Sequence, residues 1–502
     1  MGDVAVDGLD DSENFGSRIK VLGNDWPAKS RTLVRNKIAF DIATGNDRDN
    51  DSALFDKEGC VFEAAFGVVV QEFARLQKGP VHGIFHDKVV PAGFFFGAVR
   101  QNFVHARKIV KVEVCGLNSN LLFSQMMMHV PFYSLDYVER DLGSSLAGSV
   151  ASVIKSNWFI RGGSCAAFEK AFADYCGAKA CVGVGNGLDA LTLMLKASII
   201  LGRLSEGDEV IVPANTFVAT VLAVRAAGLV PVLVEPNRDT CVLDVNRLAE
   251  SCSEKTRAIL VVHLYGRLTD MPAVCEFAKS KGLLVFEDAA QSHGAKSSWT
   301  QSVQDPYGAA AYSFYPTKNL GAMGDGGAVV TDDLELAQVV KSLGNYGSVE
   351  KYVNKYVGVN SRLDEIQAAI LLTKLPRLDA WNVRRQEIAA RYCAEIKNPL
   401  VRLTPVPENP KSHVWHVFPV FCERRDELQK FLKDRGVETL IHYPIPPHKQ
   451  EAFAGAVLRG ELRHGALPIA EELARTELSI PMGPAMTEEQ VAYVIEVVNQ
   501  FK

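Results

Sequence analysis

From about residue 150 to residue 330, short apolar runs alternate with longer amphipathic stretches, and no other feature of the sequence constrains the fold as strongly. The short runs suit buried strands, whereas the intervening stretches have the apolar spacing of helices. Each stretch is long enough to cross back over a parallel sheet. The sequence therefore predicts an α/β fold with a mostly parallel sheet flanked by helices. The expected strands are Ala180–Val184, Glu209–Val212, Val230–Val234, Ala258–Val262, Leu283–Phe286, Ala310–Phe314 and Ala328–Val330. The expected helices are Ala166–Tyr175, Asp189–Ala197, Thr220–Ala227, Val245–Ser251 and Pro272–Lys281.

After about residue 358 the pattern changes to long amphipathic helices, and a smaller α+β region begins at Val414. Its expected elements are a strand over Val414–Phe421 and helices over Arg425–Arg435 and Glu488–Phe501. We therefore expect a large domain over residues 126–375. A long helix and a small C-terminal domain are expected over residues 376–502.

Residues 1–125 carry neither a sustained helical period nor strand alternation with regular turn signals. We interpret them as an N-terminal extension of unknown role, accessory or adventitious, with little expected order. The regular pattern starts just after Met126, Met127 and Met128. Our hypothesis is that the functional unit begins near these methionines.

Charge, cysteines and hydropathy narrow the classes of protein. The formal net charge is −5, so no basic excess favours a nucleic-acid partner. No apolar run approaches the length of a membrane span, and the acidic N-terminus lacks the order of a signal peptide. Ten cysteines are scattered without a CxxC pair, which is typical of reduced thiols. We expect a cytoplasmic protein that binds neither nucleic acid nor membrane.

Lys318 is the first candidate for chemistry. It lies in Ser313–Gly321, a short proline-containing loop that follows the apolar run Ala309–Tyr312 and precedes the glycines at 324–327. A lysine held next to tightly packing backbone is a candidate for Schiff-base formation. Taken alone, the alternative of a solvated surface lysine is the stronger one.

Two further segments follow predicted strands. Gly183–Leu191 places glycines at the start of a helix, where backbone N–H groups favour phosphate, although a plain tight turn is an equal alternative. The segment after Val285 ends a buried strand with Glu287 and Asp288, and an acid there could hold a ring nitrogen protonated. The alternative is a metal site made with His293. We discount it because no second His or Cys cluster is near in sequence.

Aromatic and histidine residues complete the set. Phe217 follows another strand, where a flat ring either joins the core or stacks on a planar cofactor. His413 and His416 lie in a strand-like run, which would point them to opposite faces, and we interpret them as packing or interface residues. The proline-rich loop from His442 to His448 could line a site or be a plain turn.

Together these segments resemble one family, the DegT/DnrJ/EryC1/StrS aminotransferases, which are pyridoxal-phosphate enzymes acting on nucleotide-linked keto sugars. The matching blocks, in order, are Gly185–Leu191, Pro213–Phe217, Val262–Gly266, Glu287–Gln291, Ser313–Gly321 and Asn360–Glu365. The resemblance covers residues 129–502. It implies a fold-type-I aminotransferase with a large cofactor-binding domain and a smaller C-terminal α+β domain.

The resemblance implies a role for four residues around the cofactor ring. Lys318 would form the Schiff base with pyridoxal 5′-phosphate and later move the proton between cofactor and substrate carbon. Asp288 would pair with the pyridine nitrogen and keep the ring an electron sink. Gln291 would contact the ring hydroxyl, and Phe217 would stack on the ring face.

The remaining roles concern the phosphate and the sugar. Gly187 and Leu188 would offer backbone N–H groups to the phosphate, with the Ser313 hydroxyl beside them. Asn360 would reach the phosphate of the neighbouring subunit, which implies a homodimer with shared active sites. His442 and Tyr443, on their loop, would lie near the sugar.

Lys318 also distinguishes between subclasses of this family, because relatives that dehydrate sugars carry histidine at this position. The lysine implies transamination, with L-glutamate as donor. Three segments look most like enzymes that aminate C3 of a dTDP-3-keto-6-deoxyhexose: Trp158–Gly162, Asn345–Ser348 and Ile441–Ile445. The alternatives are amination at C4 of a UDP- or dTDP-4-keto sugar and a non-catalytic pyridoxal-phosphate-binding regulator. Arg267 and the segment Ser297–Tyr307 depart from the family pattern and could alter substrate fit.

Overall fold

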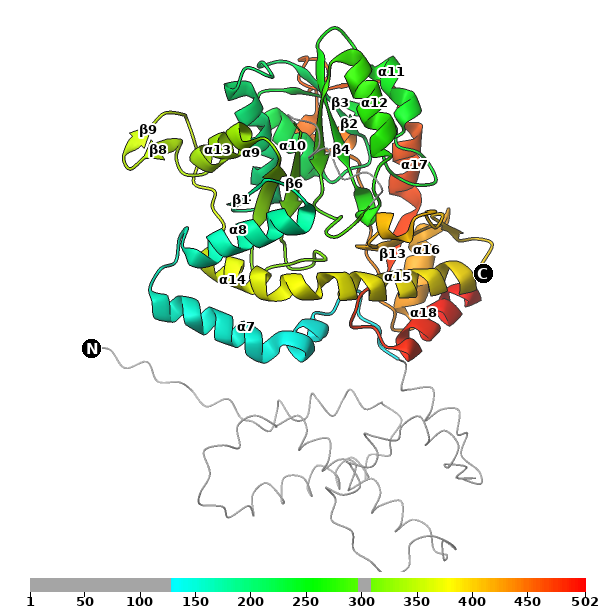
Figure 1. The fold of residues 1–502 in the computed structure, drawn as a ribbon. Coiled ribbons are helices and arrows are strands. Elements are labelled where there is room, and N and C mark those ends of the chain that lie inside the picture. Colours follow the sequence, from blue (N-terminus) through cyan, green and yellow to red (C-terminus); the bar gives the residue numbers. More distant parts are fainter. Residues whose placement is uncertain (1–127, 297–307) are drawn as a thin grey trace, which may run out of the picture. The chain divides into compact units, whose positions relative to one another are not determined.

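The computed structural model describes residues 128–296 and 308–502, so the expectations for residues 1–125 and for Ser297–Tyr307 lie outside the described residues. An eight-stranded sheet is the centre of the larger part of the fold (Figure 1), in the order β1-β7-β6-β5-β4-β2-β3-β12. Its strands are β1 (Ala180–Val184), β2 (Glu209–Pro213), β3 (Val230–Val234), β4 (Thr256–Val262), β5 (Leu284–Asp288), β6 (Ala309–Ser313), β7 (Gly327–Thr331) and β12 (Arg463–His464).

All neighbouring strands in this sheet are parallel except where β7 pairs antiparallel with both β1 and β6. The expected mostly parallel sheet is therefore confirmed. Because β7 lies between them and opposes both, β1 and β6 run in the same direction as the rest. Their carboxyl ends meet those of β2 and β5 at one edge of the sheet, which is the edge where open α/β sheets bind ligands.

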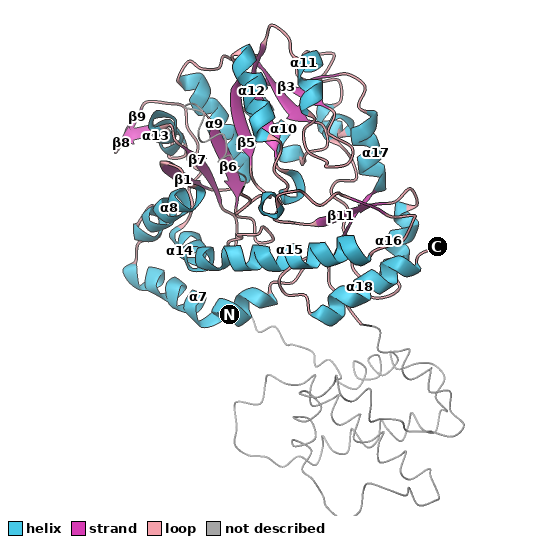
Figure 2. Cartoon of the chain, turned by 45° about the vertical axis from the view of Figure 1, so that its right-hand side comes forward, coloured by secondary structure: helices cyan, strands magenta, loops and turns pink. Residues whose placement is uncertain are grey.

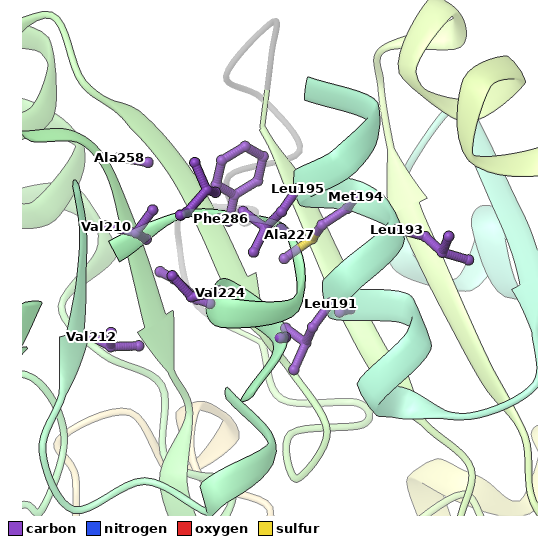
Figure 3. Close-up of a cluster of buried hydrophobic side chains, with 14 of the residues drawn as sticks. Leu191, Leu193, Met194, Leu195, Val210, Val212, Val224, Ala227, Ala258 and Phe286 are labelled. Atoms are coloured by element: carbon purple, nitrogen blue, oxygen red, sulfur yellow. The ribbon is translucent and has the colours of Figure 1, made fainter. Parts of the chain in front are cut away.

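Helices cover both faces of the sheet because successive strand residues point to opposite sides. On β6, Ala309 and Ala311 pack in one core, and Ala310 and Tyr312 in another. Helices α9 (Gly187–Ile200), α10 (Val218–Ala226) and α13 (Leu334–Leu343) contribute to the first core, and Figure 3 shows Leu195 of α9 beside Phe286 of β5. On the opposite face lie α8 (Gly163–Cys176), α11 (Leu248–Ser251), α12 (Met271–Lys281) and α14 (Glu365–Lys374).

A second core is built around a three-stranded antiparallel sheet, with β10 (Arg402–Leu403), β11 (Phe418–Phe421) and β13 (Glu477–Ile480) in the order β10-β11-β13. Helices α15 (Leu378–Glu395), α16 (Arg425–Lys433) and α18 (Glu488–Gln500) pack against it (Figure 2). Helices α7 (Asp136–Ser156) and α17 (Pro468–Thr476) and the small hairpin of β8 (Ser348–Glu350) and β9 (Val353–Asn354) complete the major elements.

The domain boundary predicted after residue 375 stays a prediction. Segments from each side of this boundary contact the core on the other side. Strand β12, from the C-terminal part, pairs in parallel with β3 at the edge of the large sheet. Conversely, Val130 forms a bridge with Val437 and is fully buried in the second core. No helix within the described ranges, 128–296 and 308–502, is long and apolar enough to span a membrane.

The expected strands and helices are present, most of them with shifted ends, apart from two corrections. The strand expected over Val414–Phe421 begins only at Phe418, because Trp415 has a positive φ of 48° that interrupts an extended strand. The premise that His413 and His416 alternate along one strand was therefore wrong. The helix expected over Val245–Ser251 is a 3₁₀ turn followed by the single-turn α11.

Candidate active site

A cavity of about 500 Å³ opens at the carboxyl edge of the large sheet. The residues that line it belong to segments at or after the ends of different strands: Gly187 and Leu188 after β1, Phe217 after β2, Asp288 at the end of β5, and Ser313 and Lys318 at and after β6. Gln291, His416, His442 and Tyr443 also line it. The structure thus brings together in one cavity every residue singled out from the sequence for cofactor or substrate, except Asn360.

Lys318 lies on a loop that is fixed from several sides. The loop closes on itself, since the Lys318 N–H donates to the Tyr315 carbonyl at 2.9 Å. Asn319 donates to the Asn382 side chain at 2.8 Å, and the Lys374 ammonium donates to the Gly321 carbonyl. Burial lowers the pKa of Lys318 to about 8, although nearby Asp288 acts to raise it. A lysine with this pKa has a substantial neutral fraction near pH 8, and the neutral amine is the nucleophilic form.

Asp288 faces Lys318 from the end of β5 and is 7% exposed. Its carboxylate accepts hydrogen bonds from Thr220 Oγ1 at 2.7 Å and from the Ala290 N–H at 3.2 Å. Burial raises the pKa of Asp288, while these two hydrogen bonds and Lys318 lower it. Sequence reasoning missed Thr220, whose hydroxyl also lies 2.7 Å from that of Thr216 in the turn before α10.

Glu287, the neighbour of Asp288, serves a different partner. Its carboxylate lies 2.6 Å from Nε2 of His263, and both side chains are fully buried. Since adjacent strand residues point to opposite faces, Glu287 and Asp288 do not converge on one ligand. His293 is buried beside the rings of Tyr312 and Phe314. Within the residues that the structure describes, no group of three His, Cys, Asp or Glu is placed to hold a metal.

The start of α9 approaches the end of β6 closely. Asn186 caps the helix, with its side-chain oxygen accepting the Asp189 N–H at 2.9 Å. A Cβ added to Gly187 would lie 2.6 Å from the Cβ of Ser313, so a glycine is required at this approach. The first N–H groups of a helix have no partner within it and favour an anion. Gly187, Leu188 and the Ser313 hydroxyl therefore lie together at a helix start whose chemistry suits an anion.

Aromatic and amide groups lie on the other side of the cavity. The half-exposed ring of Phe217 is centred 5.0 Å from the ring of Tyr443. Gln291 Nε2 donates to the Tyr443 hydroxyl at 3.0 Å, and Gln291 Oε1 accepts the Tyr265 N–H at 2.6 Å. Tyr265 was missed from the sequence. Its backbone has a positive φ of 59°, and nothing in the sequence indicates this conformation.

His413 and His416, which were interpreted from the sequence as packing or interface residues, have different surroundings. His413 stacks on Trp415 with ring centroids 3.7 Å apart, in agreement with a packing role. His416, by contrast, lines the cavity, and its Nδ1 lies 3.2 Å from Asn319 Oδ1, next to Lys318 in sequence. Arg267, the departure noted from the sequence, lies away from the cavity and donates to the Pro405 carbonyl at 2.6 Å.

Asn360 is exposed and does not line the cavity of its own chain. It forms a bridge with Asn345. Two of the segments that resemble C3 aminotransferases, Trp158–Gly162 and Asn345–Ser348, carry exposed aromatic side chains. Trp158 is 62% exposed and Tyr346 is 52% exposed.

Comparisons with known proteins agree with this geometry. Residues 141–499 match the DegT/DnrJ/EryC1/StrS aminotransferase family. The chain is 47% identical to dTDP-3-amino-3,6-dideoxy-alpha-D-galactopyranose transaminase of Aneurinibacillus thermoaerophilus, over 74% of this chain and 99% of that protein. It is 45% identical to the erythromycin biosynthesis sensory transduction protein EryC1 of Saccharopolyspora erythraea, over 73% of this chain and 98% of that protein. The crystal structure of S. venezuelae DesV in complex with a ketimine intermediate matches with a TM-score of 0.68 and 43% identity, over 74% of this chain and 98% of that one.

Proposed function

Because the chain belongs to the DegT/DnrJ/EryC1/StrS aminotransferase family, we propose that it aminates a dTDP-linked keto sugar with pyridoxal 5′-phosphate as cofactor. The observation that supports this most directly is that Lys318 and the buried Asp288 line the same cavity of about 500 Å³. That volume lies within the range of small-molecule sites.

The residues present fit this cofactor. Gly187 lacks the Cβ that would collide with Ser313, which leaves a helix start open to a phosphate group. Asp288 supplies a buried carboxylate for a protonated ring nitrogen, and Phe217 and Tyr443 supply flat rings beside it. When bound, pyridoxal 5′-phosphate would carry the amino group and withdraw electrons from the carbon being aminated.

The protein's own groups then have separate tasks. Lys318, with its lowered pKa, acts as nucleophile and afterwards takes and returns a proton at the substrate carbon. Hydrogen bonds from Thr220 and the Ala290 N–H favour the ionised form of Asp288 and orient its carboxylate. Gln291 holds the Tyr443 hydroxyl, and the His442–Tyr443 loop faces the sugar.

For the finer substrate assignment we propose a dTDP-3-keto-6-deoxyhexose, with L-glutamate as amino donor, in the biosynthesis of an amino sugar. The name of the 47% identical relative supports amination at C3. Amination at C4 of a UDP- or dTDP-4-keto sugar remains the alternative within the enzyme class. A regulatory role is the alternative outside it, and the name of the 45% identical relative gives it a specific basis.

The active form that we propose is a homodimer with shared sites. Asn360 is exposed and outside its own cavity, and the nearby surface carries the exposed rings of Trp158, Phe159 and Tyr346. Exposed apolar clusters of this kind mark protein interfaces. We also place the protein in the cytoplasm, because free cysteines such as Cys165 and Cys181 are typical of a reducing compartment.

The direct test is to incubate the purified protein, the cofactor and L-glutamate with a panel of 3-keto and 4-keto sugars linked to dTDP or UDP. Product structure is read by NMR, and 2-oxoglutarate release by coupled assay. A 3-amino dTDP-sugar is expected, and the Lys318→Ala variant should form none. A 4-amino product would overturn the C3 assignment. A protein that binds the cofactor but aminates no sugar and releases no 2-oxoglutarate would favour the regulator.

A further inference from the structure

A buried carboxyl group is connected to the active-site cavity behind His442. Leu440 and Ser479 exchange two backbone hydrogen bonds, of 3.2 and 2.7 Å. This antiparallel register places His442 opposite Glu477, and the His442 N–H donates to Glu477 Oε2 at 2.5 Å. Because residues two apart on a strand share a face, Glu477 and Ser479 of β13 both point toward His442.

Their side chains form a continuous series of hydrogen bonds. Ser479 Oγ lies 2.6 Å from Glu477 Oε1, and His442 Nδ1 lies 2.9 Å from Ser479 Oγ. Glu477 is 1% exposed and Ser479 is fully buried, whereas His442 lines the cavity. The Tyr265 hydroxyl also fixes the loop, donating to the His442 carbonyl at 2.5 Å.

The direction of these hydrogen bonds depends on Glu477. An ionised carboxylate only accepts hydrogen bonds, so Ser479 must donate to it, and the Ser479 oxygen then accepts a hydrogen bond from His442 Nδ1–H. In that state Nε2 of a neutral His442 carries no proton. A protonated Glu477 can instead donate to Ser479, whose hydroxyl then donates to Nδ1, and the ring proton lies on Nε2.

We propose that Glu477 and Ser479 are positioning residues that form a proton relay behind His442, so that the protonation of Glu477 decides whether His442 Nε2 donates or accepts a hydrogen bond in the cavity. Three proton transfers make up one passage of the relay. A proton arrives at Nε2, the Nδ1 proton moves to Ser479 Oγ, and the Ser479 proton moves to Glu477 Oε1. His442 stays neutral, and Glu477 changes from charged to neutral.

The surroundings suit such a relay. Burial raises the pKa of Glu477 to about 8, against the lowering effects of Ser479, the His442 N–H and Arg425. Burial, and then Lys318, lower the pKa of His442 to about 4, so the ring is neutral while Glu477 titrates. The other titratable groups facing Glu477 are Cys241, Tyr265 and Tyr443, and burial raises the pKa of each.

The relay gives His442 a defined task in the proposed function, on which this part of the inference rests. The oxygen of a keto group leaves as water during amination, and its departure needs a proton donor. With Glu477 protonated, His442 Nε2 is such a donor on the cavity side. The proton is then replaced from Glu477 through Ser479 without charging the imidazole.

The primary test needs neither substrate nor turnover. The holoenzyme is labelled with ¹⁵N-histidine, and the His442 ring signals are identified by their loss in His442→Asn. Between about pH 6 and about pH 10, either side of the Glu477 pKa, the neutral His442 ring is expected to change from mostly Nε2–H to mostly Nδ1–H. A tautomer that stays the same across this range would overturn the proposal.

Variants test each member of the relay separately. In Glu477→Gln the amide oxygen should still accept the hydrogen bond from the backbone N–H of His442. The amide NH₂ group then faces Ser479 and donates a hydrogen bond to it. His442 is then expected to remain Nε2–H at every pH. Ser479→Ala should uncouple the ring from Glu477 and abolish the pH-dependent change, and Ser479→Thr, which keeps the hydroxyl, should restore it. Glu471→Gln is the matched control, because Glu471 contacts His448 at 3.1 Å and should leave the His442 signals unchanged.

Steady-state kinetics provide the second readout. With the sugar that the substrate panel identifies, Ser479→Ala is expected to lower kcat about tenfold with KM within about twofold, and Glu477→Gln to flatten the alkaline limb of the kcat profile. An unchanged kcat in both variants would overturn the catalytic part of the relay. Because the NMR measurement omits substrate, its result holds even if the protein proves to aminate another sugar.

Discussion

Thr220 Oγ1 lies 2.7 Å from Asp288 Oδ2, so the first turn of α10 donates a hydrogen bond to the carboxylate at the end of β5. Removing this donor in Thr220→Val should raise the pKa of Asp288 and weaken its pairing with a protonated ring nitrogen. Hydrogen bonds to charged groups contribute about 1.5–3 kcal/mol, so cofactor affinity should fall by about tenfold or more. Equilibrium dialysis with pyridoxal 5′-phosphate measures it. Thr373→Val, in α14 outside the cavity, is the control, and equal affinities in both variants would contradict the role of Thr220.

A second prediction concerns the close approach of α9 and β6. The alanine Cβ of Gly187→Ala would lie 2.6 Å from the Cβ of Ser313, so the helix start must move. Overpacking of this kind costs about 1–3 kcal/mol, and we expect a loss of that size in cofactor binding free energy. Gly148→Ala is the matched control, since nothing lies within 4 Å of its Cβ in α7 and its unfolding free energy should rise. Undiminished cofactor binding by Gly187→Ala would show that this approach does not shape the phosphate site.

The third prediction addresses the shared active site. Lys318→Ala and Asn360→Ala homodimers should each be impaired. After mixing and subunit exchange, one site of each heterodimer carries both substitutions and the other carries neither, so activity should return to about a quarter of the wild-type level. Lys318→Ala mixed with Asp288→Asn is the control, because both residues belong to one cavity and every hybrid site carries one substitution. No recovery in the first mixture would mean that Asn360 acts within its own subunit.

The fourth prediction concerns Lys374, which is 2% exposed and whose ammonium donates to the Gly321 carbonyl in the loop that carries Lys318. Burial lowers its pKa from 10.5 to about 8. Between these values the unfolded chain binds more protons than the folded one, so this lysine's contribution to stability rises with pH. The unfolding free energy of Lys374→Met relative to wild type should therefore fall between pH 7 and pH 10, by at most about 3 kcal/mol. Urea denaturation at several pH values measures it.

The control for Lys374 is Lys170→Met, at an exposed position in an i,i+4 pair with Asp174. Its difference from wild type should vary little with pH, because screening makes such surface pairs weak. Parallel pH curves for Lys374→Met and wild type would contradict the assignment of a depressed pKa to Lys374.

The large sheet could be read from the sequence because its strands are buried on both faces. Continuous apolar runs such as Val230–Val234 and Ala180–Val184 coincide with β3 and β1. The region around Trp415 could not be read in this way. Its residues are apolar like a strand, but the backbone turns at Trp415, and the N–H groups of Val414 and His416 bond to Gly266 and Tyr265 instead of a neighbouring strand.

The residues of the candidate site also fall into those that the sequence predicted and those that it did not. Lys318, Asp288 and Gly187 were found because each stands in a local pattern next to a predicted strand. Thr220, His416 and Tyr265 were missed because their contacts depend on how distant segments pack. Glu477 and Ser479 are the clearest case, since a pairing between β13 and the segment before His442 leaves no trace in the sequence of either.

The pairing of β12 with β3 also bears on how this chain can be divided experimentally. A fragment that stops at the predicted boundary would lack Arg463 and His464 and would expose the edge of β3 along an otherwise complete sheet. Unpaired strand edges recruit other chains, so such a fragment should self-associate rather than remain monomeric. Supplying residues 376–502 as a separate polypeptide during refolding should suppress that self-association by restoring the missing strand.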